Sequence, residues 1–502
     1  MGEFEFDPSA LKQKRDPCEE AAEHKVEPFV LVIFGGTGDL SRKKLLPSLY
    51  ELFFKAKLVD EFSVLAVGSR KFSDDEFRNL ALDAIKQYGT SSIDLSRVQD
   101  FLKHLHYYSH DLNQDGHYGE LCDRLTQICN SHQVPVKNTV YYLAVHPEMV
   151  AEVIERLRKV EMCHNTPNSK IIIEKPFGTD RVSAETLNTQ LSKVFGEEQI
   201  YRMDHYLGKD TVQNILFFRF GNSILEPLWN RNYIERVDII VDEDIGVEAR
   251  GKLYEQSGIV RDVVQNHALQ ILSLIAMEPP AGFDAELIRD EKVNVLRHVR
   301  KLSKEHIVKF MVRGQYREGT VQGQKVVGYR QEPNVASNSN TPTFFSGKFF
   351  IDNSRWADVP FNIRAGKRLA ERKTEVVISF KFPALRLFGN SCKDLHANEL
   401  IFKIQPQEKI CWHLNVKRPG MGNYPQTVPM VFDYDVMFNE KRLPPYERLL
   451  ADCIRGDAML FARRDEVEAM WSIVDPINAF WDNNPAQDFP NYAAGTFGPV
   501  LK

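Results

Sequence analysis

The sequence has few cysteines and no pattern that would use them together. Seven cysteines are spread over 502 residues, and no two of them form a CxxC pair. Neither a disulfide framework nor a zinc site is therefore indicated, and reduced thiols of an intracellular protein are the expectation. Residues 1–27 are polar and acidic and lack the apolar core of a secretory signal. We predict a cytoplasmic protein.

Long hydrophobic runs and an excess of one charge are also missing. No uninterrupted apolar stretch reaches the ~20 residues that a membrane-spanning helix needs. The 64 basic residues nearly balance the 69 acidic ones, which gives a formal net charge of −5. That balance favours neither nucleic acid nor a membrane as partner, so any anion-binding site must be local.

The sequence does contain apolar strands that alternate with amphipathic helices. A chain of 502 residues is expected to form two or more domains. After a polar segment at 1–27, which we expect to be a mobile tail, continuous apolar runs follow at residues 30–34, 64–67, 140–145 and 171–173. Continuous runs separated by helices are typical of a parallel sheet covered on both faces. We predict a Rossmann-like, dinucleotide-binding α/β domain over residues 28–205.

The pattern changes after residue 205. Strand-like runs that alternate or lengthen follow at residues 237–241, 308–312, 344–351, 375–380, 400–404 and 410–416. Neighbouring strands without helices between them favour an antiparallel sheet. We predict a large α+β domain with a mainly antiparallel sheet over residues 206–502.

The first apolar run ends in a glycine-rich turn that consists of Gly35, Gly36, Thr37, Gly38, Asp39 and Leu40. Glycines let the backbone approach a phosphate, and a helix that starts here offers N–H donors and the positive end of its dipole. The spacing differs from the standard G-x-G-x-x-G, so an ordinary strand–helix turn is the alternative. We interpret the turn as the pyrophosphate site of a dinucleotide.

Further strand ends carry other candidate cofactor residues, because ligands bind at the carboxyl ends of strands in such sheets. The second run is followed by Arg70 and Lys71, where a cation suits the 2′-phosphate of NADP; a solvated pair is the alternative. The run at 140–145 carries Tyr142, and the run at 171–173 leads into Lys175, a buried-strand charge that is costly unless it is used or paired. We predict that Arg70, Tyr142 and Lys175 bind NADP.

A short polar segment indicates an anionic substrate. Asp204, His205, Tyr206 and Lys209 lie within six residues of one another. Three of them are donors that suit a phosphate, and the carboxylate could orient an imidazole elsewhere in the fold. A salt bridge at a helix start would explain any one of them, but it explains the set of four less well.

A second polar group interrupts a long apolar helical pattern. Asp262 is followed five residues later by His267, in a stretch that otherwise forms core. A lone histidine here would more often be structural, and two polar clusters one turn apart make a catalytic base an equal alternative.

Taken together, these segments resemble the glucose-6-phosphate dehydrogenase family. The likeness runs from about residue 29 to the end and is carried by residues 35–40 with Lys43 and Lys44, 174–178, 202–209, 261–267, 364–367, 371–373 and 405–406. The segment from Asp204 to Lys209 is the most specific of them. The resemblance implies NADP-dependent oxidation of D-glucose 6-phosphate at C1 to 6-phospho-D-glucono-1,5-lactone, the first step of the oxidative pentose phosphate pathway.

The resemblance also implies residue roles. His267 would take the proton of the C1 hydroxyl, and Asp204 would hold its imidazole. The substrate-binding residues that it implies are Lys175, His205, Tyr206, Lys209, Glu243, Asp262, Lys367, Arg372 and Gln405, of which His205, Tyr206 and Lys209 would hold the 6-phosphate. No metal is implied, because a base and the nicotinamide suffice for hydride transfer.

Two alternatives and two assembly features complete these expectations. The alternatives are a related sugar oxidoreductase with another substrate and a non-catalytic NADP-binding sensor, against which the pair of Asp204 and His267 speaks. The family forms dimers and tetramers through its large sheet, so we expect a homodimer or homotetramer. Some members hold a structural second NADP; two cationic positions of that site fall here on Val377 and Lys403, so we expect no tight second NADP.

Overall fold

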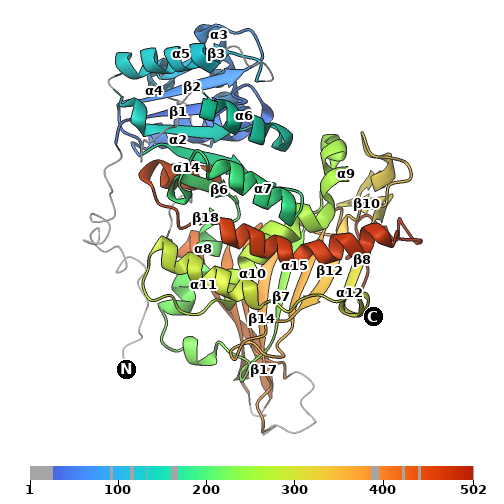
Figure 1. Cartoon of the computed structure of the whole chain (residues 1–502). Helices are drawn as coiled ribbons and strands as arrows, with labels where there is room; N and C mark the ends of the chain where they lie inside the picture. The colour runs from blue at the N-terminus through green and yellow to red at the C-terminus, as the bar shows by residue number, and fades with distance from the viewer. Residues whose placement is uncertain are drawn as a thin grey trace, which may run out of the picture. The chain divides into compact units, whose positions relative to one another are not determined.

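The computed structural model describes residues 27–90, 94–112, 118–132, 134–159, 168–385, 395–420, 424–438 and 443–500, in two compact units (Figure 1). One unit comprises Met1–Lys175, Thr189–Met203 and Tyr434–Phe461, and the other comprises Pro176–Asn188, Asp204–Asp433 and Ala462–Lys502. The boundary near residue 205 stays a prediction. Residues 176–188 belong to the second unit and residues 434–461 to the first, so one boundary near residue 205 does not separate the two units completely. The predicted tail lies outside the described residues, apart from Glu27.

The first unit is built on a seven-stranded sheet in the order β18-β6-β5-β4-β1-β2-β3. Its strands are β1 (Phe29–Phe34), β2 (Phe62–Gly68), β3 (Leu105–Ser109), β4 (Thr139–Leu143), β5 (Lys170–Glu174), β6 (Ile200–Met203) and β18 (Phe461–Ala462). The strands from β6 to β3 pair in parallel. Every residue of β1, β2 and β4 is buried, as expected for strands covered on both faces. The predicted doubly wound plan is confirmed.

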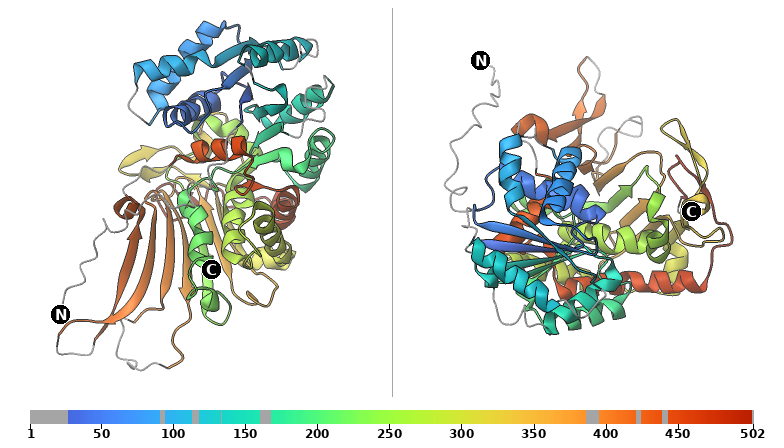
Figure 2. Two further views of the ribbon diagram at one scale, coloured as in Figure 1. Left: turned by 90° about the vertical axis from the view of Figure 1, so that its left-hand side faces the viewer. Right: turned by 90° about the horizontal axis from the view of Figure 1, so that it is seen from above.

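Helices cover both faces of this sheet (Figure 2, right). They are α2 (Leu46–Phe54), α3 (Asp74–Tyr88), α4 (Leu95–Lys103), α5 (Tyr118–Ser131), α6 (Pro147–Lys159) and α14 (Pro445–Arg455), while α7 (Arg181–Leu191) is divided between the units. Local signals set their ends. Ser73 caps α3 in a capping box with Glu76, and α14 ends at Gly456 with a φ of +88°.

The second unit is built on an eight-stranded sheet in the order β17-β16-β15-β14-β7-β13-β12-β8. Its strands are β7 (Ile234–Asp242), β8 (Met311–Gly314), β12 (Phe344–Phe349), β13 (Phe361–Gly366), β14 (Lys373–Phe380), β15 (Glu399–Gln405), β16 (Lys409–Lys417) and β17 (Pro425–Asp433). All neighbours are antiparallel except β7 and β13. The prediction of a mainly antiparallel sheet is confirmed.

Helices pack on one face of the large sheet (Figure 2, left). The helices of this unit are α8 (Asp210–Phe220), α9 (Gly251–Ile259), η8 (Val260–Ala268), α10 (Leu269–Ala276), α11 (Ala285–His298), α12 (Lys304–Phe310) and α15 (Arg464–Asn483). The long polar-interrupted helix expected from the sequence is thus an α9–η8–α10 run with a π-helical middle. None of the helices among the described residues is both long enough and apolar enough to cross a bilayer.

One predicted strand is wrong in its first half. The run at 308–312 was expected to be extended, but residues 304–310 form α12 and the strand β8 begins only at Met311. The hydroxyl of Ser303 accepts the N–H of His306 and caps the helix. This cap holds an apolar, β-branched segment in helix until Phe310.

Candidate active site

The glycine-rich turn after β1 is a tight loop that leaves no room for a side chain at Gly35 and Gly36. Gly35 and Gly36 both donate their N–H to the carbonyl of Val67 at 2.9 Å. Gly35 has a φ of +86°, and a Cβ there would lie 2.2 Å from the carbonyl oxygen of Ala144. A Cβ on Gly36 would lie 2.5 Å from the Cβ of Ala66. The turn therefore lies directly against the two neighbouring strands.

The residues after this turn fit a pyrophosphate group. Gly38 donates its N–H to the carbonyl of Gly35 at 2.9 Å, and a helical stretch begins at Asp39 and continues as η2 (Ser41–Leu45). The first N–H groups of a helix lack partners within it and, with the helix dipole, favour an anion. Arg42 adds a cation whose buried Nε has no hydrogen-bond partner among the described residues.

The turn after β2 carries two exposed cations, Arg70 and Lys71. The hydroxyl of Tyr107 lies 2.9 Å from the carbonyl oxygen of Gly68 and 2.7 Å from that of Arg70. This hydroxyl therefore fixes the backbone from which the Arg70 side chain extends.

Tyr142 lies near the end of β4, and Lys175 directly follows the neighbouring parallel strand β5. The hydroxyl of Tyr142 does not point toward solvent. Its side chain is fully buried, and its hydroxyl donates to Oε1 of Glu174 at 2.5 Å. Burial and the Glu174 carboxylate raise the pKa of Tyr142 well above its usual value, so the donor stays protonated. Tyr142 thus orients the residue beside Lys175, which is half-buried.

In the second unit, a π-helical segment positions the polar side chains of the interrupted helix. Gly258, with a φ of +58°, turns the chain into η8. A π-helix has a wider turn than an α-helix, so residues five apart, such as Asp262 and His267, share a face. The amide of Asn266 stabilises the segment, because Oδ1 accepts the N–H of His267 at 2.7 Å and Nδ2 donates to the carbonyl of Arg261 at 3.1 Å.

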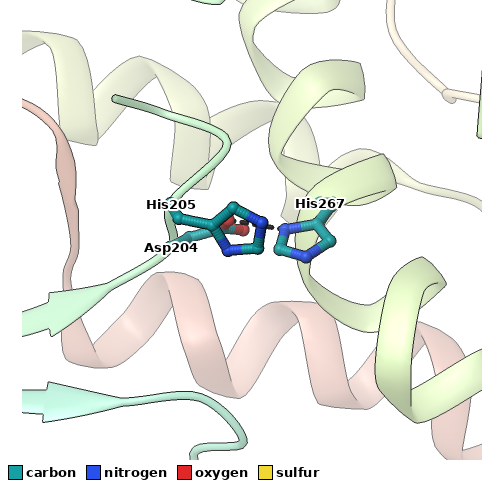
Figure 3. A group of neighbouring side chains, drawn as sticks. All are labelled: Asp204, His205 and His267. Carbon is teal, nitrogen blue, oxygen red and sulfur yellow. Dashed lines mark hydrogen bonds and ion pairs between the residues drawn. The ribbon is translucent and has the colours of Figure 1, made fainter. Parts of the chain in front are cut away.

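His267 and Asp204 form a buried pair (Figure 3). Nδ1 of His267 lies 2.5 Å from Oδ1 of Asp204, which also accepts the N–H of Tyr206 at 2.9 Å. In the neutral imidazole Nδ1 carries the proton that the carboxylate accepts, so Nε2 has its lone pair and can take up a second proton. Burial raises the pKa of Asp204, but the charge and hydrogen bond of His267 outweigh it and hold the pKa below its usual value. The pair can therefore act as a base held by an ionised carboxylate.

Two aromatic rings surround this imidazole. The ring of Tyr206 stacks on that of His267 with centroids 4.0 Å apart, and the ring of His205 meets it edge-on at 4.6 Å. The ligand atoms of Asp204, His205 and His267 all lie within 4.8 Å of one another, a spacing that a metal ion could also use.

Lys209 lies beside this group in a half-buried position with a neutral partner. Its Nζ donates to Oε1 of Gln405 at 2.5 Å and lies 4.5 Å from the centre of the Tyr206 ring. Desolvation lowers the pKa of Lys209 to about 8, and the nearby cation Arg372 lowers it as well, whereas Glu408 raises it. Among the described residues no carboxylate lies within ion-pair distance of Lys209, and a cation that is partly stripped of water in this way is suited to an incoming phosphate.

Lys367 is the most buried cation of the site. Its Nζ lies 2.5 Å from Oε2 of Glu243 and 3.1 Å from Oδ2 of Asp262. Burial lowers the pKa of Lys367, but the two carboxylates raise it by a larger amount. The pKa is therefore above its usual value, and the group is charged. The ring of Tyr254 covers it, with Nζ 5.2 Å from the ring centre. This network presents acceptors and a donor of the kind that bind sugar hydroxyls.

The second unit thus contains most of the substrate and catalytic residues expected from the sequence. They are Asp204, His205, Tyr206, Lys209, Glu243, Asp262, His267, Lys367, Arg372 and Gln405. Arg372 is exposed, and its charge acts on both Tyr206 and Lys209. Lys175 belongs to the first unit.

Sequence reasoning missed the residues that support this site from behind. Thr374, Tyr254 and Tyr107 touch candidate site residues, and Oε2 of Glu408 accepts the N–H of Thr211 at 3.2 Å in the first turn of α8. Tyr254 and Tyr107 are ordinary core residues by pattern. Glu408 follows Gln405 closely, and that proximity was the one available signal.

Comparison with known proteins covers nearly the whole chain. Residues 32–214 match the family model "Glucose-6-phosphate dehydrogenase, NAD binding domain", and residues 216–501 match "Glucose-6-phosphate dehydrogenase, C-terminal domain". The chain is 43% identical over 472 residues to the glucose-6-phosphate 1-dehydrogenase of Bacillus subtilis, covering 94% of this chain and 95% of that one. It is also 43% identical over 477 residues to that of Borreliella burgdorferi, with 95% and 96% covered.

Two solved structures are similar over the same extent. One is a glucose-6-phosphate dehydrogenase in complex with its substrate glucose-6-phosphate, with a TM-score of 0.84, 34% identity and coverage of 94% of this chain and 96% of that one. The other is a glucose-6-phosphate 1-dehydrogenase from Mycobacterium avium, with a TM-score of 0.79, 34% identity and coverage of 94% and 95%.

Proposed function

The chain belongs to the glucose-6-phosphate dehydrogenase family, and from that premise we propose that it oxidises D-glucose 6-phosphate at C1 to 6-phospho-D-glucono-1,5-lactone. The observation that carries the proposal is the buried pair of His267 and Asp204 beside the half-buried Lys209. A base and a phosphate-binding cation lie in the same unit, as the reaction requires. The product would enter the oxidative pentose phosphate pathway.

His267 is the proposed base. Its Nε2 accepts the proton of the C1 hydroxyl while the C1–O bond becomes a carbonyl. A nicotinamide cofactor held at residues 35–40 would supply the acceptor for the hydride that leaves C1. The ionised Asp204 stabilises the imidazolium that forms, because it already holds Nδ1 at 2.5 Å. Asp204 acts through His267 and does not itself exchange a proton with the sugar.

The remaining substrate residues divide by chemistry. Lys209, Tyr206 and His205 bind the 6-phosphate, with Arg372 and Gln405 at its side. Lys367, Glu243 and Asp262 bind sugar hydroxyls, and the resemblance implies the same role for Lys175 of the first unit. The charges of the two groups support this division. In the first group, Lys209 has no carboxylate within ion-pair distance among the described residues. In the second group, Lys367 forms ion pairs with two carboxylates.

NADP is the proposed cofactor within the nicotinamide class. Residues 35–40 would bind its pyrophosphate, and Arg70 would bind the 2′-phosphate that distinguishes NADP from NAD. Gly35, Gly36, Thr37, Gly38, Asp39 and Leu40 make up this loop. The tight backbone of Gly35 and the exposed guanidinium of Arg70 support the assignment.

We also propose a homodimer or homotetramer in the cytoplasm. The strands β16 and β17 lie at one edge of the large sheet, and they expose Val416, Met430 and Val431. Monomeric proteins rarely leave a group of apolar side chains exposed at a sheet edge. The cysteines that the structure describes are unpaired thiols, as expected of a reducing compartment.

The direct test is the formation of reduced nicotinamide from four pairs of substrates. Glucose 6-phosphate or glucose is combined with NADP or NAD, and absorbance is followed. We expect rapid reduction only with glucose 6-phosphate, and faster reduction with NADP than with NAD. A sensor would bind NADP without turnover, and an enzyme for another sugar would oxidise that sugar in preference; either result would overturn the proposal. Parallel assays with a chelator test the expectation that no metal is needed.

A further inference from the structure

Thr374 is a buried hydroxyl behind the proposed phosphate-binding residues. It is the second residue of β14, its side chain is fully buried, and the pairing of β14 with β15 shifts register directly after it. Its Oγ1 lies 2.8 Å from Nε2 of Gln405 and 3.4 Å from the hydroxyl oxygen of Tyr206. No sequence motif and no matching family description singles this residue out.

The chemistry of Lys209 determines the direction of the hydrogen bonds that Gln405 makes. Lys209 can only donate, so Oε1 of Gln405 is the acceptor of the 2.5 Å bond between them. The amide nitrogen of Gln405 therefore faces the other way and donates to Oγ1 of Thr374, and also to the Tyr206 hydroxyl oxygen at 3.3 Å.

This direction leaves one proton of the network unassigned. Oγ1 of Thr374 accepts from Gln405. Its 3.4 Å contact with Tyr206 permits either oxygen to donate, and the O–H of Thr374 is the donor when the O–H of Tyr206 turns to a substrate. The Tyr206 oxygen then accepts from Gln405 and from Thr374, and its own O–H has no acceptor left within the network. A phosphate oxygen is an acceptor only, and it suits a hydroxyl donor held in this way.

We propose that Thr374 is a positioning residue that turns the O–H of Tyr206 and the side chain of Gln405 toward the 6-phosphate of the substrate. The proposal rests on the proposed function, because it assumes that the phosphate binds beside Tyr206 and Lys209. Thr374 itself does not touch the substrate. It keeps Tyr206 a donor and keeps Gln405 Oε1 directed at Lys209.

Two matched pairs of variants isolate the hydroxyl. Thr374→Val replaces it by a methyl group of similar shape, and Thr374→Ala and Thr374→Ser both lose the methyl group but differ in the hydroxyl. We expect KM for glucose 6-phosphate to rise roughly three- to tenfold in the Val and Ala variants, typical of one hydrogen bond, and to recover in Ser. kcat, KM for NADP and the slow oxidation of unphosphorylated glucose should stay within about twofold, because no reacting group is changed.

Inorganic phosphate provides a second readout on the same enzyme. Its inhibition constant against glucose 6-phosphate should rise by the same factor in the Val and Ala variants. Ser379→Ala, a buried hydroxyl on the same strand with a bond to Glu399, controls for loss of packing in β14 and should leave both constants unchanged. If the Val variant does not fold, the comparison of Ala with Ser decides the question alone.

The outcomes separate the two proposals. An unchanged KM in Val and Ala, or a KM in Ser equal to that in Ala, would refute the role of Thr374 while leaving the function intact. Loss of kcat with glucose as well as with glucose 6-phosphate would mean a general structural role. Absence of any glucose 6-phosphate oxidation in the unmodified enzyme would refute the proposed function itself.

Discussion

In the first unit the candidate site consists mainly of backbone N–H groups and exposed cations at strand ends. In the second unit it consists mainly of buried and half-buried side chains that bind one another. Gly35 and Arg70 belong to the first kind. His267 and Lys367 belong to the second kind, since both are nearly inaccessible and each has an ionisable partner within 3.1 Å. Removing one member of a buried pair leaves the other uncompensated, so substitutions in the second unit should cost more.

The largest effect is expected at His267. Its replacement by Asn removes the proposed base and should lower kcat by about 10²–10⁴-fold, with a much smaller change in KM. Asp204→Asn should give an intermediate loss, because that carboxylate acts only through the imidazole. Steady-state kinetics with glucose 6-phosphate and NADP provide the measurement. A His267→Asn enzyme with near-normal kcat would remove His267 from the mechanism.

The next largest effect is expected at Lys209. Lys209→Thr removes a charge-assisted contact to the phosphate worth about 1.5–3 kcal/mol, which corresponds to a rise in KM of roughly 10- to 150-fold. Unphosphorylated glucose should stay an equally poor substrate. Lys381→Thr, an exposed lysine at the end of β14, is the matched control. Proportional loss with both sugars would show that Lys209 is not the phosphate ligand.

The contrast between the two units also explains which parts of the molecule the sequence could predict. Continuous apolar runs indicated β1 and β4, and the glycine turn followed β1 as expected, because these signals are local. The helix α14 lies in the part of the chain that we predicted to form the second domain, yet it belongs to the first unit, although residues 204–433 of the second unit precede it along the chain. A local pattern says that a helix is amphipathic but not which sheet it covers.

The candidate site shows the same limit. Asp204 and His267 were paired through resemblance to a family, whereas the residues alone left a structural histidine equally open. Thr374 gave no signal at all, because a threonine in a strand is ordinary. Its role depends on three segments that meet only in the folded chain: the turn before α8, which carries Tyr206, then β14, and the end of β15, which carries Gln405.

A pH profile should sharpen the contrast within the second unit. Burial lowers the pKa of Lys209 to about 8, so in the free enzyme the side chain is charged below that pH and neutral above it. The phosphate of the substrate is already a dianion above about pH 7. KM for glucose 6-phosphate should therefore rise several-fold, up to about tenfold, between about pH 7.5 and about pH 9.

Lys209→Arg provides the control for this profile. A guanidinium stays charged throughout the range, so the rise in KM should disappear in this variant even if KM is higher overall. A wild-type KM that does not change across about pH 8 would show that the cation at the phosphate keeps its charge and that its environment is less dehydrated than the structure indicates.

A smaller effect is expected in the first unit. Arg70 is exposed, so its contact with the 2′-phosphate should contribute about 1 kcal/mol, and Arg70→Ala should raise KM for NADP about fivefold. KM for NAD should stay nearly unchanged, because NAD lacks that phosphate. Lys71→Ala tests the second cation of the same turn, and we expect it to have a smaller effect on KM for NADP than Arg70→Ala. Equal loss for both cofactors would mean that Arg70 is structural, and Lys71 or Arg42 would be the next candidates.

The smallest effect concerns a second NADP in the large domain. Arg364 and Lys373 occupy two of the cationic positions that the family resemblance implies for such a site, and both are already paired in the structure. Arg364 binds the buried carboxylate of Asp242, and Lys373 lies 3.2 Å from Glu371 and 3.1 Å from Glu375. A phosphate would have to compete with these carboxylates for both cations.

The other two positions of that pattern weaken the site further. Val377 offers no charge, and Lys403 offers a point charge where the pattern has a forked arginine. We therefore expect that the protein, purified without added cofactor and then denatured, releases far less than one equivalent of NADP per subunit. Added NADP should raise the unfolding temperature only by binding at the glycine loop. In the Arg70→Ala variant, a higher NADP concentration should therefore be needed to reach the same unfolding temperature. About one equivalent that survives gel filtration, or a stabilisation that Arg70→Ala leaves unchanged, would show that the large domain holds a second NADP, and that carboxylate pairing does not close such a site.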